Sequence, residues 1–392
     1  MSDESAGSAG PAPLGVLGGG QLGRMFVHAA QAAGFRVVVL DPDVDSPAGR
    51  AADLQVRTGY ADPAGLAELA RHCRAVTTEF ENVPAATLEY LASQNLFVAP
   101  AAAAVRVCQH RVAEKRFFRQ AGVACAPFAP IETSEDIGRI DADLLPGILK
   151  SSQLGYDGKG QVAVRSLLEL ESAWASLSKV PCLLEKRLPL RRELSVVLAR
   201  DRRGVIVHLP VQQNLHSDGI LAVTQVPAPD IPAAVGEEAV RMAARLAQEL
   251  AYVGVLCVEF FLLEDGSLVA NEMAPRPHNS GHYSIDACDL SQFDLQVRVL
   301  AGMPLVPPRQ HSAAVMLNLL GDLWFTSPTS AARTPDWVGV LALPGMHLHL
   351  YGKSEPRRGR KMGHLTVTAA EPLLALARAR EAAALLGLPA ID

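Results

Sequence analysis

A pair of strand-like segments joined by Asp265–Gly266 constrains the fold of this 392-residue chain more than any other feature. Residues 254–263 are rich in β-branched and aromatic side chains, and residues 267–272 form the returning strand of a hairpin with a two-residue type I′ turn. In that register Glu259 lies directly opposite Glu272, where like charges repel across about 5 Å. The hairpin therefore predicts a divalent cation between the two carboxylates, unless one glutamate faces solvent or a bulge breaks the register.

The segment that follows the hairpin, residues 271–282, is a polar loop. Its two prolines oppose helix formation and leave Arg276 and His278 on irregular backbone, where binding groups are often placed. His278 and His282 have the spacing of a helical metal-binding pair, but the same prolines argue against such a site. We therefore expect an anionic substrate to contact Arg276 and His278.

The composition indicates a globular protein with room for two or three domains. Hydrophobic residues make up 49% of the chain, and 36 basic against 41 acidic residues give a net charge of −5. That balance argues against nucleic-acid and membrane-surface proteins, although it leaves room for a local basic pocket. Six scattered cysteines without a C-x-x-C motif, and a start that lacks signal-peptide features, indicate the cytoplasm. Residues 1–13 are expected to be a disordered tail, and no apolar run is long enough to span a bilayer.

The N-terminal third begins with a glycine turn in a βαβ unit. Strands at 14–17 and 36–41 enclose a helix, and the turn at 18–23 matches G-x-G-x-x-G. Taken literally, this motif predicts a dinucleotide site with Asp41 on the ribose. The same glycines also let any phosphate or small ligand approach the helix N-terminus, where the amide of Gln21 could reach it.

Alternation of strands and helices continues to residue 98 and implies an open parallel sheet with helices on both faces. Glu79 and Asn82 follow the third strand, at the edge where such sheets bind ligands. Asn82 is equally suited to cap the next helix. The expected helices are at 63–72 and 84–93, and the expected strands at 75–78 and 96–98.

Antiparallel strands dominate the rest of the chain, after a helix at 105–120 and a linker at 124–130. A glycine-rich loop at 151–161 follows Lys150 and could cover phosphates as a flap, or could be a surface hairpin; it is not a Walker A loop. The basic segment 352–364 suits a phosphate pocket or a solvated face. The remaining strands are expected at 147–150, 162–165, 182–185, 193–200, 205–211, 219–226, 313–319 and 346–351, and the helices at 170–177, 231–252, 291–301 and 372–386.

Five motifs give the chain a resemblance to a known family: residues 18–25, 79–83, 155–161, 271–282 and 359–364. From about Leu14 to its C-terminus the chain resembles the ATP-grasp superfamily and, within it, the N5-carboxyaminoimidazole ribonucleotide synthases. The last three motifs together are highly specific. The implied fold class is α/β and α+β, a Rossmann-like parallel-sheet domain followed by an ATP-grasp fold with antiparallel sheets. The implied domains are a pre-ATP-grasp domain at 14–122, a lid domain at 123–185, and a central and C-terminal domain at 186–392.

The resemblance implies a carbon–nitrogen ligase of de novo purine biosynthesis. Such enzymes cleave ATP to ADP and phosphate while bicarbonate is joined to the amine of 5-aminoimidazole ribonucleotide. ATP and Mg²⁺, or Mn²⁺, are the implied cofactors, and a cytoplasmic homodimer is the implied state. Formate-dependent glycinamide ribonucleotide transformylases are the nearest alternative, but Tyr156–Asp157 and the motifs at 279–282 and 360–364 favour the carboxylating enzymes. A nicotinamide-dependent oxidoreductase would explain only the first glycine turn.

The resemblance also assigns roles to individual residues. Glu259 and Glu272 would hold the metal. The implied ATP site comprises Arg111, Lys150, Gly155, Tyr156, Asp157, Gly158, Lys159, Gly160, Gln161, Glu185, Lys186, Arg187, Leu188, Glu193, His216, Asn271 and Glu272. The implied contacts to the other substrates come from Gln21, Glu79, Tyr156, Asp157, Arg276, His278, Asn279, Lys353 and Arg360, and the implied catalytic set is Asp157, Lys159, Arg276, His278 and Lys353. The chain departs from the family pattern at Ser151–Gln153, ahead of the flap, and at Gln213.

Overall fold

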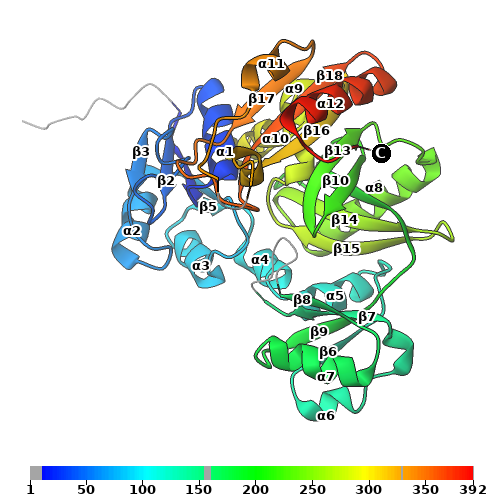
Figure 1. Ribbon diagram of the computed structural model, residues 1–392. Coiled ribbons are helices and arrows are strands. Elements are labelled where there is room, and N and C mark those ends of the chain that lie inside the picture. The colour runs from blue at the N-terminus through cyan, green and yellow to red at the C-terminus, as the bar shows by residue number, and fades with distance from the viewer. Residues whose placement is uncertain (1–10, 154–159, 328–329, 392) are drawn as a thin grey trace, which may run out of the picture.

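The N-terminal domain contains the predicted parallel sheet, with strand order β3-β2-β1-β4-β5. The computed structural model describes residues 11–153, 160–327 and 330–391, and this domain lies on the left of Figure 1. Its elements are β1 (Leu14–Leu17), α1 (Gln21–Ala32), β2 (Val37–Leu40), β3 (Leu54–Val56), α2 (Pro63–His72), β4 (Ala75–Thr78), α3 (Ala85–Ser93) and β5 (Phe97–Val98).

The strands of this sheet are apolar on both sides because helices cover both faces. Val37 and Val39 belong to the core that contains α1, whereas Val38 and Leu40 belong to the core that contains α2 and α3. Strand β3 was not predicted: only the last of its three residues is buried, so it lacks an apolar pattern.

The predicted single helix at 105–120 is wrong, because the structure has two helices there. Helix α4 (Ala102–Cys108) ends before Gln109, whose side chain donates to two backbone carbonyls of the loop between β4 and α3. Helix α5 (Arg111–Gln120) begins after His110, whose ring caps it by accepting from Ala113 N at 3.4 Å. Hydrogen bonds between the backbone and the side chains of Gln109 and His110 thus end one helix and begin the next, although the composition of this segment favours a continuous helix.

The small domain at the bottom of Figure 1 is an antiparallel sheet of order β6-β9-β7-β8. The predicted linker at 124–130 is partly wrong, since its second half belongs to β6 (Phe128–Ile131), which pairs with β9. A strand with a partner this distant in sequence leaves little local signal. The other elements are α6 (Ser134–Ile137), η1 (Ala142–Leu144), β7 (Gly147–Ser151), β8 (Gln161–Val164), α7 (Leu167–Ser176) and β9 (Cys182–Lys186).

The large antiparallel sheet has the order β15-β14-β10-β12-β13-β16-β18-β17, with β11 paired to β10. Its strands are β10 (Leu190–Arg200), β11 (Ile206–His208), β12 (Gln212–Ser217), β13 (Ile220–Val226), β14 (Gly254–Leu263), β15 (Leu268–Ala274), β16 (Ala313–Leu320), β17 (Met346–Leu350) and β18 (Lys361–Ala369). The helices around it are α8 (Ala233–Glu249), η2 (Asn279–Gly281), α9 (Ser284–Ala287), α10 (Gln292–Ala301), η3 (Gly321–Trp324), α11 (Trp337–Leu341) and α12 (Pro372–Leu386).

Two expectations for this sheet are corrected. Strand β18 occupies the end of the basic segment 352–364, which was expected to be a loop throughout. Strand β12 was missed because its sequence is polar. Its buried Gln212 and Asn214 bond to the hydroxyl of Ser195 on β10, at 3.0 and 2.9 Å, so polar side chains there satisfy one another.

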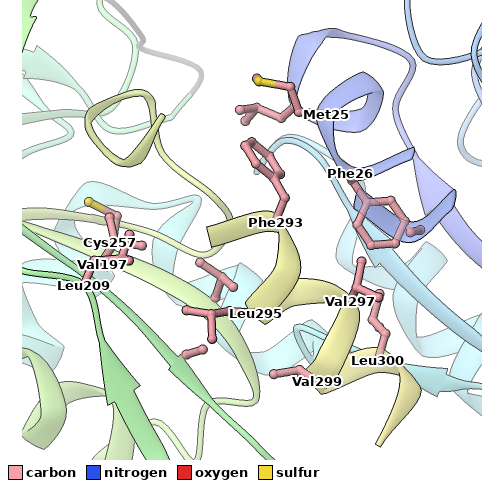
Figure 2. Close-up of a cluster of buried hydrophobic side chains, with 14 of the residues drawn as sticks. Met25, Phe26, Val197, Leu209, Cys257, Phe293, Leu295, Val297, Val299 and Leu300 are labelled. Carbon is pink, nitrogen blue, oxygen red and sulfur yellow. The ribbon is translucent and has the colours of Figure 1, made fainter. Parts of the chain in front are cut away.

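Helix α10 joins the N-terminal domain to the large sheet. Figure 2 shows Phe293, Val297 and Leu300 of α10 beside Met25 and Phe26 of α1, within one cluster of buried hydrophobic side chains. The same cluster includes side chains of β10 and β14, so the two parts share a core. None of the helices in the described parts of the chain has both the length and the apolar character needed to cross a membrane.

Candidate active site

The hairpin β14–β15 places Glu259 directly opposite Glu272, as predicted, but by a different route. Pairing near the turn runs through Leu262 and Leu268, and Gly266 N donates to Leu263 O at 3.0 Å, so the loop has three residues and the predicted two-residue turn is wrong. A bulge then adds one residue to β15, between the partners of Glu259 and Phe260. The longer loop and the bulge each shift the register by one residue, in opposite directions, so Glu259 and Glu272 remain paired.

The two opposed carboxylates have different electrostatic surroundings. Burial and the charge of Glu272 raise the pKa of Glu259 to about 7. Burial also opposes ionisation of Glu272, but the charges of Arg111 and Lys150 outweigh it and hold the pKa of Glu272 below its ordinary value. The guanidinium of Arg111 is 3.1 Å from Glu272. Repulsion between the carboxylates is therefore only partly compensated by the protein itself.

Helix α5 holds the bulge of β15 from a different part of the chain. Arg111 pairs with Glu272, the buried Glu114 carboxylate accepts from Met273 N at 2.7 Å, and Lys115 donates to Asn271 O at 2.5 Å. Three successive residues of the bulged strand are thus fixed by one helix. Glu114 and Lys115 were not among the predicted site residues, and their only sequence signal is charge in a helix that also buries apolar side chains.

We expect this support to be measurable at Glu114. Glu114→Leu leaves the buried N–H of Met273 without its acceptor, which costs about 1–3 kcal/mol of unfolding free energy. If Glu272 holds Mg²⁺ as the hairpin predicts, loosening of its strand should also weaken the apparent affinity for Mg²⁺ about 10- to 100-fold, measured from the Mg²⁺ dependence of activity. Glu114→Gln keeps an acceptor and is the matched control. Equal losses in both variants would contradict this role of the hydrogen bond.

A second buried group joins α5 to the small domain. Glu185 on β9 pairs with Lys150 of β7 and, at 2.6 Å, with Lys115 of α5. Burial opposes its ionisation, but the two lysines hold the pKa of Glu185 at about 2. The Glu185 side chain is committed to the lysines, and Lys186 N and Arg187 N donate to Pro127 O and Pro146 O at 2.9 Å each, so the predicted adenine hinge at 185–188 does not offer these groups to a nucleotide.

His216 and Glu193, both predicted for the nucleotide site, form an ion pair between neighbouring strands β12 and β10. Burial opposes the charged form of His216, but the hydrogen bond to Glu193 and the nearby Glu259 raise its pKa above the ordinary value. The pair therefore lies beside the opposed carboxylates.

The polar loop after β15 holds Arg276 and His278 firmly. Arg276 pairs with Glu81 of the N-terminal domain. Burial disfavours the ionised form of Glu81, but the positive charge of Arg276 outweighs burial and lowers the pKa of Glu81 to about 2. His278 Nε2 is 3.2 Å from Glu259, and Ser280 N donates to His278 Nδ1 at 3.3 Å, so Nε2 carries the proton. Burial and Arg276 lower the pKa of His278 well below its ordinary value, which keeps the ring neutral. Sequence reasoning missed Glu81, although it lies in the motif at 79–83.

The glycine turn binds acidic side chains of its own domain. Glu79 accepts from Gly20 N at 2.6 Å and Gly23 N at 2.8 Å, so both of its oxygens hold the start of α1. Asp41 accepts from Gly19 N and the Tyr60 hydroxyl, each at 2.6 Å, which contradicts the ribose-binding role that the literal dinucleotide motif predicts.

Most of the predicted residues meet in one cleft of about 910 Å³, formed where the three parts of the molecule in Figure 1 converge. The predicted residues that line it are Gln21, Glu79, Arg111, Lys150, Gln161, Glu185, Lys186, Arg187, Leu188, Glu193, His216, Glu259, Asn271, Glu272, Arg276, His278 and Asn279. Lys361, which was not predicted individually, also lines the cleft.

The other predicted residues lie elsewhere or are outside the described residues. Lys353 donates to Lys361 O at 2.7 Å, and Arg360 to Glu355 O at 2.8 Å; neither side chain lines the cleft. Gly160 lies near the end of the predicted flap, and its carbonyl accepts from Ser151 N. Gly155, Tyr156, Asp157, Gly158 and Lys159 are outside the described residues.

Three family models match successive parts of the chain. A ribonucleotide synthetase preATP-grasp domain matches residues 12–109, and an ATP-grasp domain matches residues 116–293. A phosphoribosylaminoimidazole carboxylase C-terminal domain matches residues 314–378. These matches follow the order of the N-terminal parallel sheet, the central sheets and the C-terminal strands.

Similar proteins extend the likeness over nearly the whole chain. The N5-carboxyaminoimidazole ribonucleotide synthase of Brucella melitensis is 44% identical over 90% of this chain and 95% of its own length. That of Bacillus subtilis is 37% identical over 91% of each chain. The Staphylococcus aureus N5-carboxyaminoimidazole synthetase complexed with ADP has a TM-score of 0.87 and 36% identity, covering 96% of this chain and 97% of its own. The Aspergillus clavatus synthase in complex with ADP and 5-aminoimidazole ribonucleotide has a TM-score of 0.87 and 31% identity, covering 96% and 99%.

Proposed function

This chain belongs to the N5-carboxyaminoimidazole ribonucleotide synthase family of ATP-grasp ligases, and we propose that bicarbonate is the carbon source with which it carboxylates 5-aminoimidazole ribonucleotide. The reaction is driven by ATP and belongs to purine biosynthesis. One observation carries the assignment of the site: a single cleft brings opposed carboxylates and the buried Lys150 next to a fixed arginine and a neutral histidine.

The nucleotide side of the cleft suits phosphoryl transfer, which depends chiefly on positioning and charge neutralisation. Lys150 and Arg111 bring positive charge to it, and each is already oriented by a carboxylate. The remaining backbone groups at 185–188 would hold the adenine, and Glu193 the ribose hydroxyls, with His216 and Asn271 beside them. The flap residues Gly155 to Gln161 would cover the phosphates, as the motif implies.

The opposed carboxylates fit Mg²⁺. Burial and Glu272 together disfavour the ionised form of Glu259, and a dication held by both oxygen groups removes that penalty. Glu259 and Glu272 would hold the ion, which supplies positive charge to the phosphates when bound. Mn²⁺ has the same charge and accepts the same oxygen ligands.

The acceptor side of the cleft is the loop at 275–282. Arg276 is fixed by Glu81, so its remaining donors can stabilise the anion derived from bicarbonate without reorganisation. The neutral His278 donates from Nε2 toward Glu259 and links the two sides of the cleft. Gln21, Asn279 and Glu79 line the same region, as substrate contacts would.

The C-terminal basic residues complete the proposed site. The charge of Lys353 acts on Glu79, which lines the cleft. This supports a position of Lys353 near the ribonucleotide. Arg360 lies one residue before the cleft-lining Lys361. We also propose, from the motif alone, that Tyr156, Asp157 and Lys159 contact the reactants, and from the family that the enzyme is a cytoplasmic homodimer.

A coupled assay of ADP release tests the function. We expect release to require ATP, bicarbonate, 5-aminoimidazole ribonucleotide and Mg²⁺ together, and to fall to background when any one is omitted. Formate with glycinamide ribonucleotide should give no turnover. Turnover with that second pair alone would overturn the assignment.

A further inference from the structure

A cluster of histidines lies at the edge of the large sheet, beside the cleft but outside its lining. His347 and His349 alternate along the edge strand β17 and project from the same face. His364 of β18 is directly opposite His349. Asp286 of α9 reaches this face with both oxygens, 2.9 Å from His349 Nε2 and 3.7 Å from His347 Nδ1. One carboxylate thus faces three imidazoles.

Three of these side chains bring donor atoms close together. One atom each from Asp286, His349 and His364 lies within 4.8 Å of the others. His364 is fully buried, and its Nδ1 is 3.0 Å from the Tyr351 hydroxyl. The Nε2 atom of His364 has no hydrogen-bond partner in the described part of the chain. Buried polar atoms in proteins normally have such a partner. A ring held through one nitrogen and bare at the other is the usual state of a metal-ligating histidine.

We propose that Asp286, His349 and His364 form a binding site for a divalent transition-metal ion of the Zn²⁺ type. Two imidazoles and one carboxylate suit zinc, whereas Mg²⁺ prefers oxygen ligands alone. Donors of a tetrahedral ion lie about 3.3 Å apart. The imidazoles of His349 and His364 are stacked with their centroids 4.5 Å apart, so a shared ion requires the more exposed ring of His349 to rotate out of the stack, with water completing the coordination.

The surroundings limit the affinity of this site. Burial, and after it the charges of Arg24 and His349, lower the pKa of His28 on α1, so Arg24 and His28 are near the cluster. His347 and His282 are further imidazole neighbours, the latter with its ring 4.8 Å from that of His364. The permanent positive charge of Arg24 opposes a cation, so we expect micromolar rather than nanomolar binding.

The ion would join three elements near the substrate cleft. It links α9 to β17 and β18, which flank the basic segment containing Lys353. His282, which contacts His364, lines the cleft itself. Binding therefore stabilises the folded state by linkage and fixes the start of that segment.

Titration of the full-length protein with Zn²⁺ in excess Mg²⁺ tests the site, because the hairpin carboxylates are proposed to hold Mg²⁺ and would then be occupied. We expect one Zn²⁺ per chain and binding at least about 100-fold weaker in His349→Ala and Asp286→Asn. His349 is partly exposed, so its replacement should leave the fold intact. Zn²⁺ should raise the Tm of the wild type but not that of His349→Ala. The matched control His72→Ala changes an exposed histidine on α2 and should bind like the wild type.

Three results would overturn the proposal. The first is the lack of stoichiometric Zn²⁺ binding in excess Mg²⁺, and the second is unchanged binding in His349→Ala. The third is loss of Zn²⁺ binding in Glu272→Gln with retention in His349→Ala, which would place the ion at the hairpin. None of these results depends on whether the ligase activity is correctly assigned.

Discussion

Glu272→Gln should abolish turnover, with kcat/KM at least about 10³-fold below that of the wild type. Glu272 lies opposite Glu259 and is one of the two carboxylates proposed to hold Mg²⁺. Glutamine keeps the shape of the side chain but removes the negative charge that a dication requires. Raising the Mg²⁺ concentration in the ADP-release assay should recover only part of the activity. Glu264→Gln, an exposed change in the turn of the same hairpin, is the control and should be silent.

The same substitution should leave the fold intact because two effects oppose each other. Repulsion from Glu259 is relieved, whereas the ion pair between Glu272 and Arg111 is lost. The Glu272 side chain is 43% exposed within the cleft, so solvent screens that pair. We expect the unfolding free energy to change by no more than about 1 kcal/mol. An inactive variant that is also unfolded would show that the pairing matters for structure and would leave the metal role unsupported.

Arg276→Leu should lower kcat/KM about 10²- to 10³-fold, because it removes the cation proposed to stabilise the bicarbonate-derived anion. It should also destabilise the protein, since Glu81 loses the partner that holds its pKa at about 2 instead of 4.5. A shift of this size corresponds to a contribution on the order of 3 kcal/mol at neutral pH. Urea denaturation and steady-state kinetics measure the two effects separately.

The pH dependence and a double variant separate the structural role of Arg276 from its chemical role. The Glu81 pKa is lowered on folding, so its contribution is present above about pH 4.5 and is lost as the pH falls through about 2. The stability gap between wild type and Arg276→Leu should therefore be constant from pH 7 to about pH 4.5 and narrow below that, toward about pH 2. The double variant Glu81→Gln, Arg276→Leu should regain stability without regaining activity. Recovery of activity in the double variant would show that Arg276 acts only as a structural partner.

Elements with strong local signals were predicted well. Helix α2 has the predicted bounds, because Asp62 caps its first turn with a bond to Gly65 N and Pro63 suits its start. Helix α12 and the apolar strands of the parallel sheet were predicted for similar reasons. Strands β6 and β12 were missed or misplaced because their pairing depends on distant partners or on buried polar bonds.

The candidate site shows the same division. The opposition of Glu259 and Glu272 follows from one hairpin, and the family motifs bring Arg276, His278 and Lys150 to notice without any coordinates. The sequence could not show that the turn has three residues and that a bulge in β15 restores the register. The turn and the bulge lie within the same short segment, and their shifts of the register cancel.

The sequence by itself determined the fold class, the family and the hairpin that opposes two carboxylates, because all three depend on residues close together in the chain. Only the tertiary structure decided which groups neutralise and position the side chains of the site. Arg276 meets Glu81 across 195 positions, and Glu114 meets Met273 N across 159. The physical reason is that an ion pair or a hydrogen bond depends on distance in space, and packing of the domains brings together charges that no local pattern connects.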